Sequence, residues 1–181
     1  MDDDRLIKVS KFLSRYLRHE PERLGLTLQP GGWAGVDELL AACAEHRFPV
    51  TRGELDEVVA RNNKRRYEID PLGTKIRASQ GHSVEVDLEL EPTQPPPVLY
   101  HGTGHKTADA ILMSGLLKMR RVHVHLSPDV ATAKSVGMRH GRPVIFTVDA
   151  AAMHLDGHRF LVSSNGVWLV DHVPPKYLRR L

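Results

Sequence analysis

The stretch that decides the fold of the first half is "VSKFLSRYLRHEP", residues 9–21, which reads as an amphipathic helix with an abrupt end. Apolar residues recur at helical spacing on one face, and basic residues lie on the other. Pro21 disfavours helical geometry at Glu20, so the helix is predicted to stop near His19. The last turn then ends with Arg18 and His19 side by side. A cation at a helix C-terminus gains only about 0.3–1 kcal/mol from the helix dipole, so a ligand is a second possible reason for the pair.

Three further segments complete the first half. A turn at "GGW" precedes a helix predicted from about Val36 to His46. Thr51 and Glu54 form the T-x-x-E pattern of a capping box, which predicts the start of a third helix. Two short strands are predicted around the turn at residues 70–73, "DPLG". Three helices followed by a β-hairpin is the element order of a winged helix.

The proline-rich stretch "LELEPTQPPPVL", residues 88–99, divides the chain. Proline cannot continue a helix or an inner strand, and proline clusters make semi-rigid spacers. We therefore predict a first lobe at 1–90, an exposed linker at 91–98 and a second lobe at 99–181.

The second lobe is predicted to contain several strands and two helices. A strand at residues 98–103 should end in a loop, and further strands are expected at 121–127, 142–150 and 166–173. One helix should be closed by Gly115, and another should have Pro128 at its start. The fold class predicted from this order is α+β, with a mainly antiparallel sheet.

Composition limits the setting in which the protein works. The 181 residues contain a single cysteine, Cys43, so no internal disulfide is possible and a cytoplasmic location is expected. No apolar run approaches the length of about 20 residues that a membrane span needs, and the start "MDDDRL" is acidic where a signal peptide is basic. We expect a monomer that does not enter a membrane.

Charge is divided unevenly between the two halves. Residues 1–91 carry 14 Lys and Arg against 17 Asp and Glu, whereas residues 92–181 carry 11 against 5. The second half also holds eight of the eleven histidines, and it contains no glutamate. A basic half favours an anionic ligand.

Several common chemistries find no support in the sequence. His123 and His125 are two residues apart on a predicted strand and so share a face, but no C-x-x-C or H-E-x-x-H pattern accompanies them, and no metal site is predicted. The G-x-S-x-G hydrolase pattern and both common glycine-rich phosphate loops are also missing.

Basic residues in three places remain as candidates, because the planar fork of arginine suits phosphate. On a strand, neighbouring side chains alternate, so Arg65 and Arg66 cannot both face one ligand. The three places are Arg18-His19, Lys64-Arg65-Arg66 and Arg139.

Taken together, the short motifs resemble the RNA 2′-phosphotransferase family over nearly the whole chain and in order. In the first lobe the matching stretches are "VSKFLSRYLRHEPERLGLTLQPGGWAGVDELL", "NKRRYEI" and "IRASQGHSVEV". In the second lobe they are "LYHGT", "VHLSPDVATAKSVGMRHGRPVIFTVDA" and "SSNGVWLVDHVPPKYL". Each motif is weak alone, and the set is specific.

The resemblance implies a winged-helix lobe that binds RNA phosphate, joined to an NAD-binding lobe similar to ADP-ribosyltransferases. It implies transfer of an internal 2′-phosphate from tRNA-like RNA to NAD⁺, as in tRNA splicing. The products would be 2′-hydroxyl RNA, nicotinamide and ADP-ribose 1″,2″-cyclic phosphate, formed through RNA that carries ADP-ribose on its 2′-phosphate. NAD is consumed, and no metal is required.

The resemblance also implies the site residues. The basic tetrad of the family falls on Arg18, His19, Arg66 and Arg139, with Arg66 preferred to Arg65 because it holds the arginine position of K-x-R-[FY]. Residues matching the NAD pocket of the family are His101, Gly102, Thr103, Leu126, Ser127, Asn165 and Gly166, together with Arg139. Structural explanations remain open for two of them: a buried histidine bonded to backbone at 101, and a turn at Gly166. The helix would then stop at His19 to present two donors to a phosphate held between the lobes.

Other functions remain as alternatives. Many protein-modifying ADP-ribosyltransferases use a glutamate, and none follows Glu91, so that class fits poorly. An enzyme that ADP-ribosylates terminal phosphates of nucleic acids would use the same residues. A non-catalytic nucleic-acid-binding module is disfavoured by the net negative first lobe.

Overall fold

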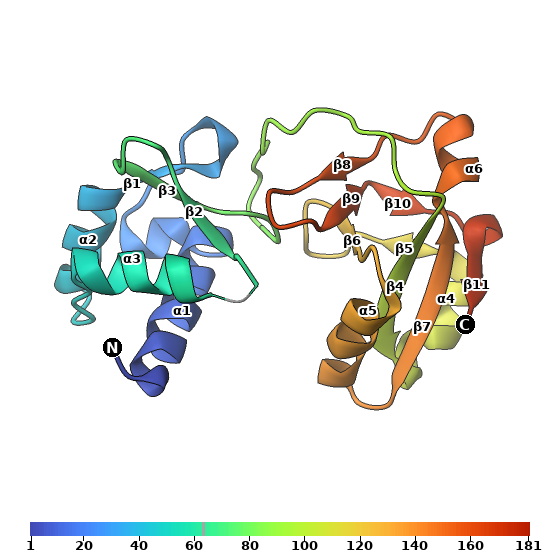
Figure 1. The fold of residues 1–181 in the computed structure, drawn as a ribbon, viewed down its shortest axis with the longest axis horizontal. Helices are drawn as coiled ribbons and strands as arrows, with labels where there is room; N and C mark the ends of the chain where they lie inside the picture. Colours follow the sequence, from blue (N-terminus) through green and yellow to red (C-terminus); the bar gives the residue numbers. More distant parts are fainter. Residues whose placement is uncertain (63) are drawn as a thin grey trace. The chain divides into compact units, whose positions relative to one another are not determined.

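The computed structural model describes residues 1–62 and 64–181, and these divide into two compact units, Met1–Glu89 and Leu90–Leu181. Each unit has its own hydrophobic core and is described by itself (Figure 1). Of the helices in the described residues, none is long and apolar enough to cross a membrane.

Three helices form most of the first unit: α1 (Asp3–Arg18), α2 (Val36–Glu45) and α3 (Arg52–Arg61). The predicted end of α1 is confirmed, with His19 as its C-terminal cap and Pro21 opening a short 3₁₀ helix, η1 (Pro21–Leu24). The capping box between Thr51 and Glu54 is also confirmed. The apolar faces of the helices pack together around a core that contains Cys43.

A small antiparallel sheet completes the first unit, with strand order β1-β3-β2. Its strands are β1 (Ala34–Gly35), β2 (Tyr67–Ile69) and β3 (Lys75–Ala78), and η2 (Pro30–Gly32) precedes β1. The predicted hairpin turn is present, because Gly73 has φ +72° and its N–H donates to the Asp70 carbonyl at 2.9 Å.

The second unit is built from three small antiparallel sheets. The first has the order β11-β7-β4, formed by β4 (Val98–Gly104), β7 (Pro143–Asp149) and β11 (Leu178–Arg180). The second has the order β6-β9-β8, formed by β6 (Val124–Leu126), β8 (Leu161–Val162) and β9 (Trp168–Val170). The third pairs β5 (Leu116–Leu117) with β10 (His172–Val173). The α+β class with antiparallel sheets is therefore confirmed.

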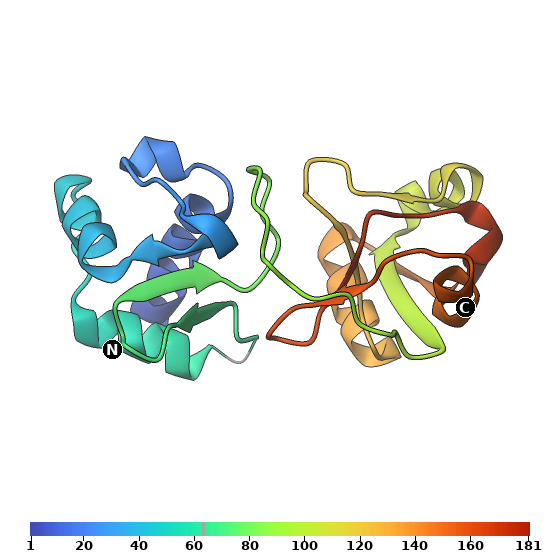
Figure 2. The same cartoon turned by 90° about the horizontal axis from the view of Figure 1, so that it is seen from above.

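Helices lie beside the first of these sheets (Figure 1, Figure 2). They are α4 (His105–Ser114), α5 (Val130–Gly137) and α6 (Ala150–Leu155), with the 3₁₀ turns η3 (Met138–His140) and η4 (Pro175–Tyr177). Gly115 closes α4, as predicted. The loop predicted after β4 is wrong, since Gly104 caps α4 directly. Pro128 lies outside α5, because Asp129 is the N-cap and accepts a hydrogen bond from the Thr132 N–H.

The segment predicted as an exposed linker, residues 91–98, is exposed at six of its eight residues but not at all three of its consecutive prolines. Pro95 is buried, and only Pro97 of the three consecutive prolines is exposed. The Thr93 N–H donates to the Phe160 carbonyl at 2.8 Å, and the Pro97 carbonyl accepts from the Ala151 N–H at 3.1 Å. These bonds tie the segment to the second unit, in which Pro95 is buried although its neighbours are largely exposed.

Candidate functional site

The C-terminal end of α1 holds the first predicted pair. The Arg18 carbonyl accepts hydrogen bonds from the N–H groups of Ser83 and Val84, at 2.9 and 3.4 Å. The His19 ring contacts the Ser83 hydroxyl through Nδ1 at 2.9 Å. Arg18 is buried, 9% exposed, whereas His19 is exposed. The segment after β3 therefore fixes the backbone that carries both side chains.

Arg66 lies just before β2, and it is oriented differently from Arg65. The sequence placed both on a strand, but β2 begins at Tyr67 and Arg65 has a left-handed backbone with φ +43°. That conformation is held by Ser79, whose hydroxyl donates to the Arg65 carbonyl at 2.8 Å. Arg65 is exposed and Arg66 is half-buried, so the two side chains do face different surroundings, through a turn and not through strand alternation.

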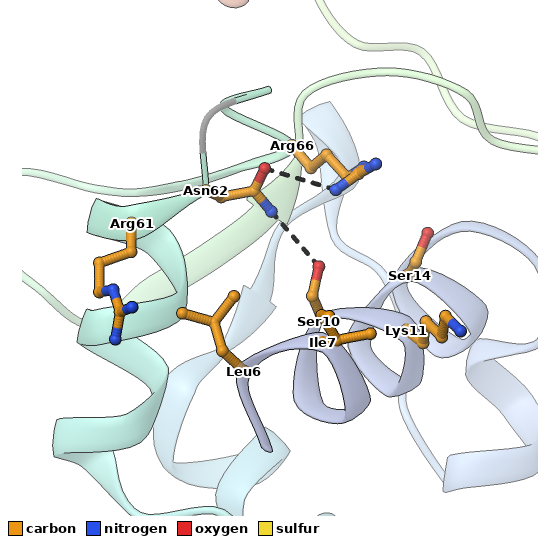
Figure 3. A pocket seen from close by; sticks show the side chains of 8 residues that line it. All are labelled: Leu6, Ile7, Ser10, Lys11, Ser14, Arg61, Asn62 and Arg66. Carbon is orange, nitrogen blue, oxygen red and sulfur yellow. Dashed lines mark hydrogen bonds between the residues drawn. The ribbon is translucent and has the colours of Figure 1, made fainter. Parts of the chain in front are cut away.

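Arg66 also lines a pocket of about 420 Å³ in the first unit (Figure 3). Its guanidinium lies 3.5 Å from the Asn62 Oδ1, and the Asn62 amide donates to the Ser10 hydroxyl at 3.3 Å. These bonds connect Arg66 to α1. The remaining lining residues are Leu6, Ile7, Lys11, Ser14 and Arg61.

Apart from Arg66, sequence reasoning did not single out the polar residues of this pocket as site residues. The signal was present in the spacing, since Ile7, Lys11, Ser14 and Arg18 recur at intervals of four, three and four residues. Such positions share one face of a helix. The pocket-lining face of α1 therefore continues, one turn later, to Arg18.

In the second unit, β4 carries His101, Gly102 and Thr103 on alternating faces. His101 Nδ1 donates to the His125 carbonyl at 3.1 Å, so in the neutral ring Nε2 is an acceptor. Burial lowers the pKa of the His101 ring, the hydrogen bond to the His125 carbonyl raises it, and the nearby charge of His140 lowers it. The net shift is downward from the ordinary 6.5, so the ring is neutral at pH 7. The Thr103 hydroxyl contacts the Thr107 hydroxyl at 2.7 Å and so helps hold the start of α4.

Gly102 has a role in packing, and the edge of β4 to which its backbone groups point also matters for the site. A Cβ at this position would lie 1.6 Å from the Ala133 carbonyl oxygen, so only glycine lets α5 approach β4. Tyr100 exchanges two backbone hydrogen bonds with Ser127, at 2.9 and 2.7 Å. Because backbone groups alternate along an antiparallel strand, those of Gly102 point to the same edge of β4 as those of Tyr100.

The other predicted cofactor residues are placed less directly. Leu126 is 1% exposed and packs in the core of the second unit, while Ser127 is half-buried and pairs with Tyr100 through its backbone. Asn165 and Gly166 lie in the turn between β8 and β9. The Asn165 Oδ1 accepts from the Ser163 hydroxyl at 2.6 Å, and Gly166 has φ +79°, so the turn itself explains the glycine.

Arg139, on η3, belongs to a basic cluster that the sequence did not reveal. Desolvation, and to a lesser degree the positive charge of Arg139, lower the pKa of Arg121. Arg121 Nη1 also donates to His125 Nδ1 at 3.3 Å. Within residues 1–62 and 64–181 neither arginine has an ion pair with a carboxylate, so the cluster is suited to an anion.

His125 joins this cluster to His101, since its carbonyl accepts from His101 and its ring accepts from Arg121. The second unit therefore connects His101, which was predicted, to Arg121, which was not, and the charge of the predicted Arg139 acts on Arg121. Among the described residues no group of three or more His, Cys, Asp or Glu is arranged to hold a metal ion.

Comparison with known proteins decides the family. Residues 4–172 match the family described as RNA 2′-phosphotransferase, Tpt1/KptA. The chain belongs to the RNA 2′-phosphotransferase family. It is 62% identical to a protein of Trichormus variabilis over 181 residues, which is 100% of both chains. It is 59% identical to a protein of Streptomyces coelicolor over 179 residues, covering 99% of this chain and 97% of that one. Both relatives carry the name "Probable RNA 2′-phosphotransferase".

Membership of the RNA 2′-phosphotransferase family makes the chain an enzyme of the transferase class. The match spans both units, from α1 to β10, and so includes the Arg18-His19 pair, Arg66 and the cluster around His101 and Arg139. Arginine and histidine side chains can donate charge-assisted hydrogen bonds to phosphate, as the reaction of this family requires.

Proposed function

We propose that this protein transfers an internal 2′-phosphate of tRNA-like RNA to NAD⁺ in the cytoplasm. The 2′-phosphate first attacks C1″ of the nicotinamide ribose, which forms a C–O bond and releases nicotinamide with the electrons of the broken C–N bond. The ribose 2″-hydroxyl then attacks phosphorus and expels the RNA 2′-oxygen. The products are 2′-hydroxyl RNA and ADP-ribose 1″,2″-cyclic phosphate.

The first unit supplies the groups proposed to bind RNA phosphate, in a winged-helix lobe. Arg18 and Arg66 would donate charge-assisted hydrogen bonds to the phosphoryl oxygens, and His19 would donate to the same group or to the departing 2′-oxygen. The Asn62 bond to Arg66 and the Ser83 contact to His19 support this assignment, because they position the two donors.

The second unit supplies the groups proposed to hold NAD⁺, in a lobe of the ADP-ribosyltransferase type. The outward backbone of Gly102 suits a carboxamide, and Nε2 of His101 suits a ribose hydroxyl, because a neutral ring bonded through Nδ1 is an acceptor there. The positive charges of Arg139 and Arg121 suit a pyrophosphate. Ser127 and Asn165 are the further polar candidates from the motifs.

The lack of glutamate in residues 92–181 fits a phosphate acceptor. A protein acceptor needs a base or an orienting carboxylate, whereas a phosphate is already ionised. The enzyme then has to position two substrates and neutralise charge, and positioning alone can supply a large part of a rate enhancement. This argument also leaves room for terminal nucleic-acid phosphates as acceptors.

The observation that carries the proposal is the hydrogen-bonded series His101–His125–Arg121, with Arg139 as a further cation. It combines a neutral imidazole that can accept a hydrogen bond from a hydroxyl with two arginines that have no ion pair to a carboxylate among the described residues. The test measures nicotinamide release from NAD⁺ with an oligonucleotide that carries an internal 2′-phosphate. We expect release that matches the loss of 2′-phosphate one for one. Release only with 3′- or 5′-phosphorylated oligonucleotides would favour terminal ADP-ribosylation, and no release with any of them would leave a binding module.

A further inference from the structure

The pocket beside α1 in the first unit extends beyond the residues assigned to the 2′-phosphate. Its volume of about 420 Å³ lies in the range of pockets that hold small ligands, roughly 300–1,000 Å³. Of the four residues predicted as the basic tetrad, only Arg66 is among the eight described residues that line the pocket. None of these eight residues is acidic. The pocket is therefore a separate compartment that shares one wall with the proposed phosphate site.

The three cations around the pocket are not equivalent. Arg61 is held by Asp3 and Glu57, at 2.7 and 2.6 Å. Within residues 1–62 and 64–181, the Arg66 side chain has only the long contact to the Asn62 amide oxygen, at 3.5 Å. Lys11 is exposed on α1, and in the described part of the chain it has no ion pair. The charge of an anionic ligand bound in this pocket would therefore be neutralised by Lys11 and Arg66.

The hydroxyl groups of the pocket also differ in their roles. Ser10 is buried and accepts from the Asn62 amide, so it belongs to the wall that holds Arg66. Ser14 is half-buried one turn further along α1, on the face that also carries Lys11 (Figure 3). Lys11, Ser14 and Arg66 thus come from two segments and offer an ammonium, a hydroxyl and a guanidinium to one space.

The spacing along α1 relates this space to Arg18. Ser14 and Arg18 are one turn apart on the same face, about 6 Å along the helix axis. A step of that size can be bridged by one nucleotide of an RNA strand. At the other end the pocket is lined by Leu6, by Ile7, which is 48% exposed, and by Arg61 (Figure 3). Because the charge of Arg61 is already paired with Asp3 and Glu57, this end suits a ribose ring better than a second phosphate.

On these grounds, and resting on the proposed function, we infer that the pocket binds the RNA backbone phosphodiester next to the 2′-phosphorylated nucleotide. Lys11 and Ser14 bind that phosphodiester, and Arg66 contacts both it and the 2′-phosphate. The ligand class is an internal phosphodiester of RNA, so the enzyme selects a 2′-phosphate within a chain over the same group on an isolated nucleoside.

The test uses the full chain and the variants Lys11→Ala and Ser14→Ala, with Lys8→Ala as the matched control. Lys8 is an exposed lysine of the same helix that does not line the pocket. Two substrates are compared: an oligonucleotide with an internal 2′-phosphate and a nucleoside 2′-phosphate that lacks flanking phosphodiesters. We expect Lys11→Ala to raise KM for the oligonucleotide about tenfold, with a much smaller effect on the nucleoside substrate.

A binding measurement keeps this inference separate from the proposed reaction. Fluorescence anisotropy with a 2′-hydroxyl oligonucleotide needs no turnover, and loss of one phosphate contact should flatten the slope of log K against log salt by about 0.7 for a single strand. That change in Lys11→Ala but not in Lys8→Ala supports the subsite even if no nicotinamide is released. Equal effects of the two substitutions, or equal KM changes for both substrates, overturn it.

Discussion

Two neighbouring arginines in the first unit should have unequal importance. Arg66 is half-buried and bonded to Asn62, whereas Arg65 is exposed on a left-handed turn. Arg66→Ala should lose a charge-assisted phosphate contact worth roughly 1.5–3 kcal/mol, or about 10- to 150-fold in kcat/KM. Arg65→Ala is the control and should keep most of the activity. Similar losses in a steady-state assay would contradict the assignment of Arg66.

The residue scale also shows where the sequence was informative. Arg18 and His19 were placed correctly at the end of α1, because Pro21 acts on the residue before it through local sterics. Arg121 was missed, because its relation to Arg139 and His125 exists only through tertiary folding. The bend at Arg65 was missed for the same reason, since Ser79, far along the chain, holds it.

At the scale of elements, the contact between β4 and α5 depends on Gly102, because glycine has no side chain to separate them. Gly102→Ala would place a Cβ 1.6 Å from the Ala133 carbonyl oxygen, and backbone must move to relieve that overlap. We expect a loss of about 3 kcal/mol or more in the free energy of unfolding. Gly53→Ala is the control, because α3 has open space at that position and alanine should stabilise the helix by up to about 1 kcal/mol. Thermal denaturation that showed Gly102→Ala as stable as the parent protein would refute the packing role.

Glu54, in the capping box at the start of α3, should make the free energy of unfolding depend on pH in the acid range. Hydrogen bonds from Arg5 and from the Thr51 N–H lower the pKa of Glu54 to about 2. Because this pKa lies below the ordinary value of 4.5, the bonds stabilise the folded state fully above about pH 4.5, and that contribution is lost as the pH falls toward 2. Glu54→Gln should therefore lower Tm at pH 7 and approach the parent protein near pH 2.

Glu45→Gln provides the comparison for this pH series. Glu45 is exposed on α2, so its substitution should leave the Tm profile nearly unchanged. A constant difference in Tm between Glu54→Gln and the parent protein from pH 7 to pH 2 would show that ionisation of Glu54 is not the cause.

The element order was largely readable from sequence, whereas the burial of Pro95 within the proline-rich segment was not. Capping residues and hydrophobic periodicity act locally, which is why α1, α2, α3 and the hairpin turn were found. Burial of Pro95 depends on Phe160 and Ala151, whose backbones hold the segment through bonds that no local pattern encodes. The start of α5 is different, because its signal is local: Asp129 is the N-cap and its carboxylate accepts from the Thr132 N–H, whereas the sequence reading placed the start at Pro128.

At the scale of the whole molecule, the two units carry different parts of the proposed reaction. Arg18, His19 and Arg66 belong to the first unit, whereas His101 and Arg139 belong to the second. The first chemical step needs NAD⁺ to be held and polarised, and an ionised phosphate near C1″ is already a competent nucleophile. The second step is more demanding, because charge accumulates on the phosphoryl oxygens and an alkoxide-like 2′-oxygen must leave.

This division predicts different kinetic consequences for substitutions in the two units. Donors aimed at charge that develops late act mainly in the second transition state, so His19→Ala or Arg66→Ala should slow the second step more than the first. RNA that carries ADP-ribose on its 2′-phosphate should then accumulate as a slower gel band and convert slowly to product. His101→Ala should slow formation of that RNA, with no accumulation, because His101 is proposed to hold NAD⁺. Single-turnover reactions with end-labelled RNA separate the steps. If His19→Ala and Arg66→Ala both lose activity and no adduct appears at any time, the residues of the first unit act before nicotinamide leaves, and the division of labour between the units is wrong.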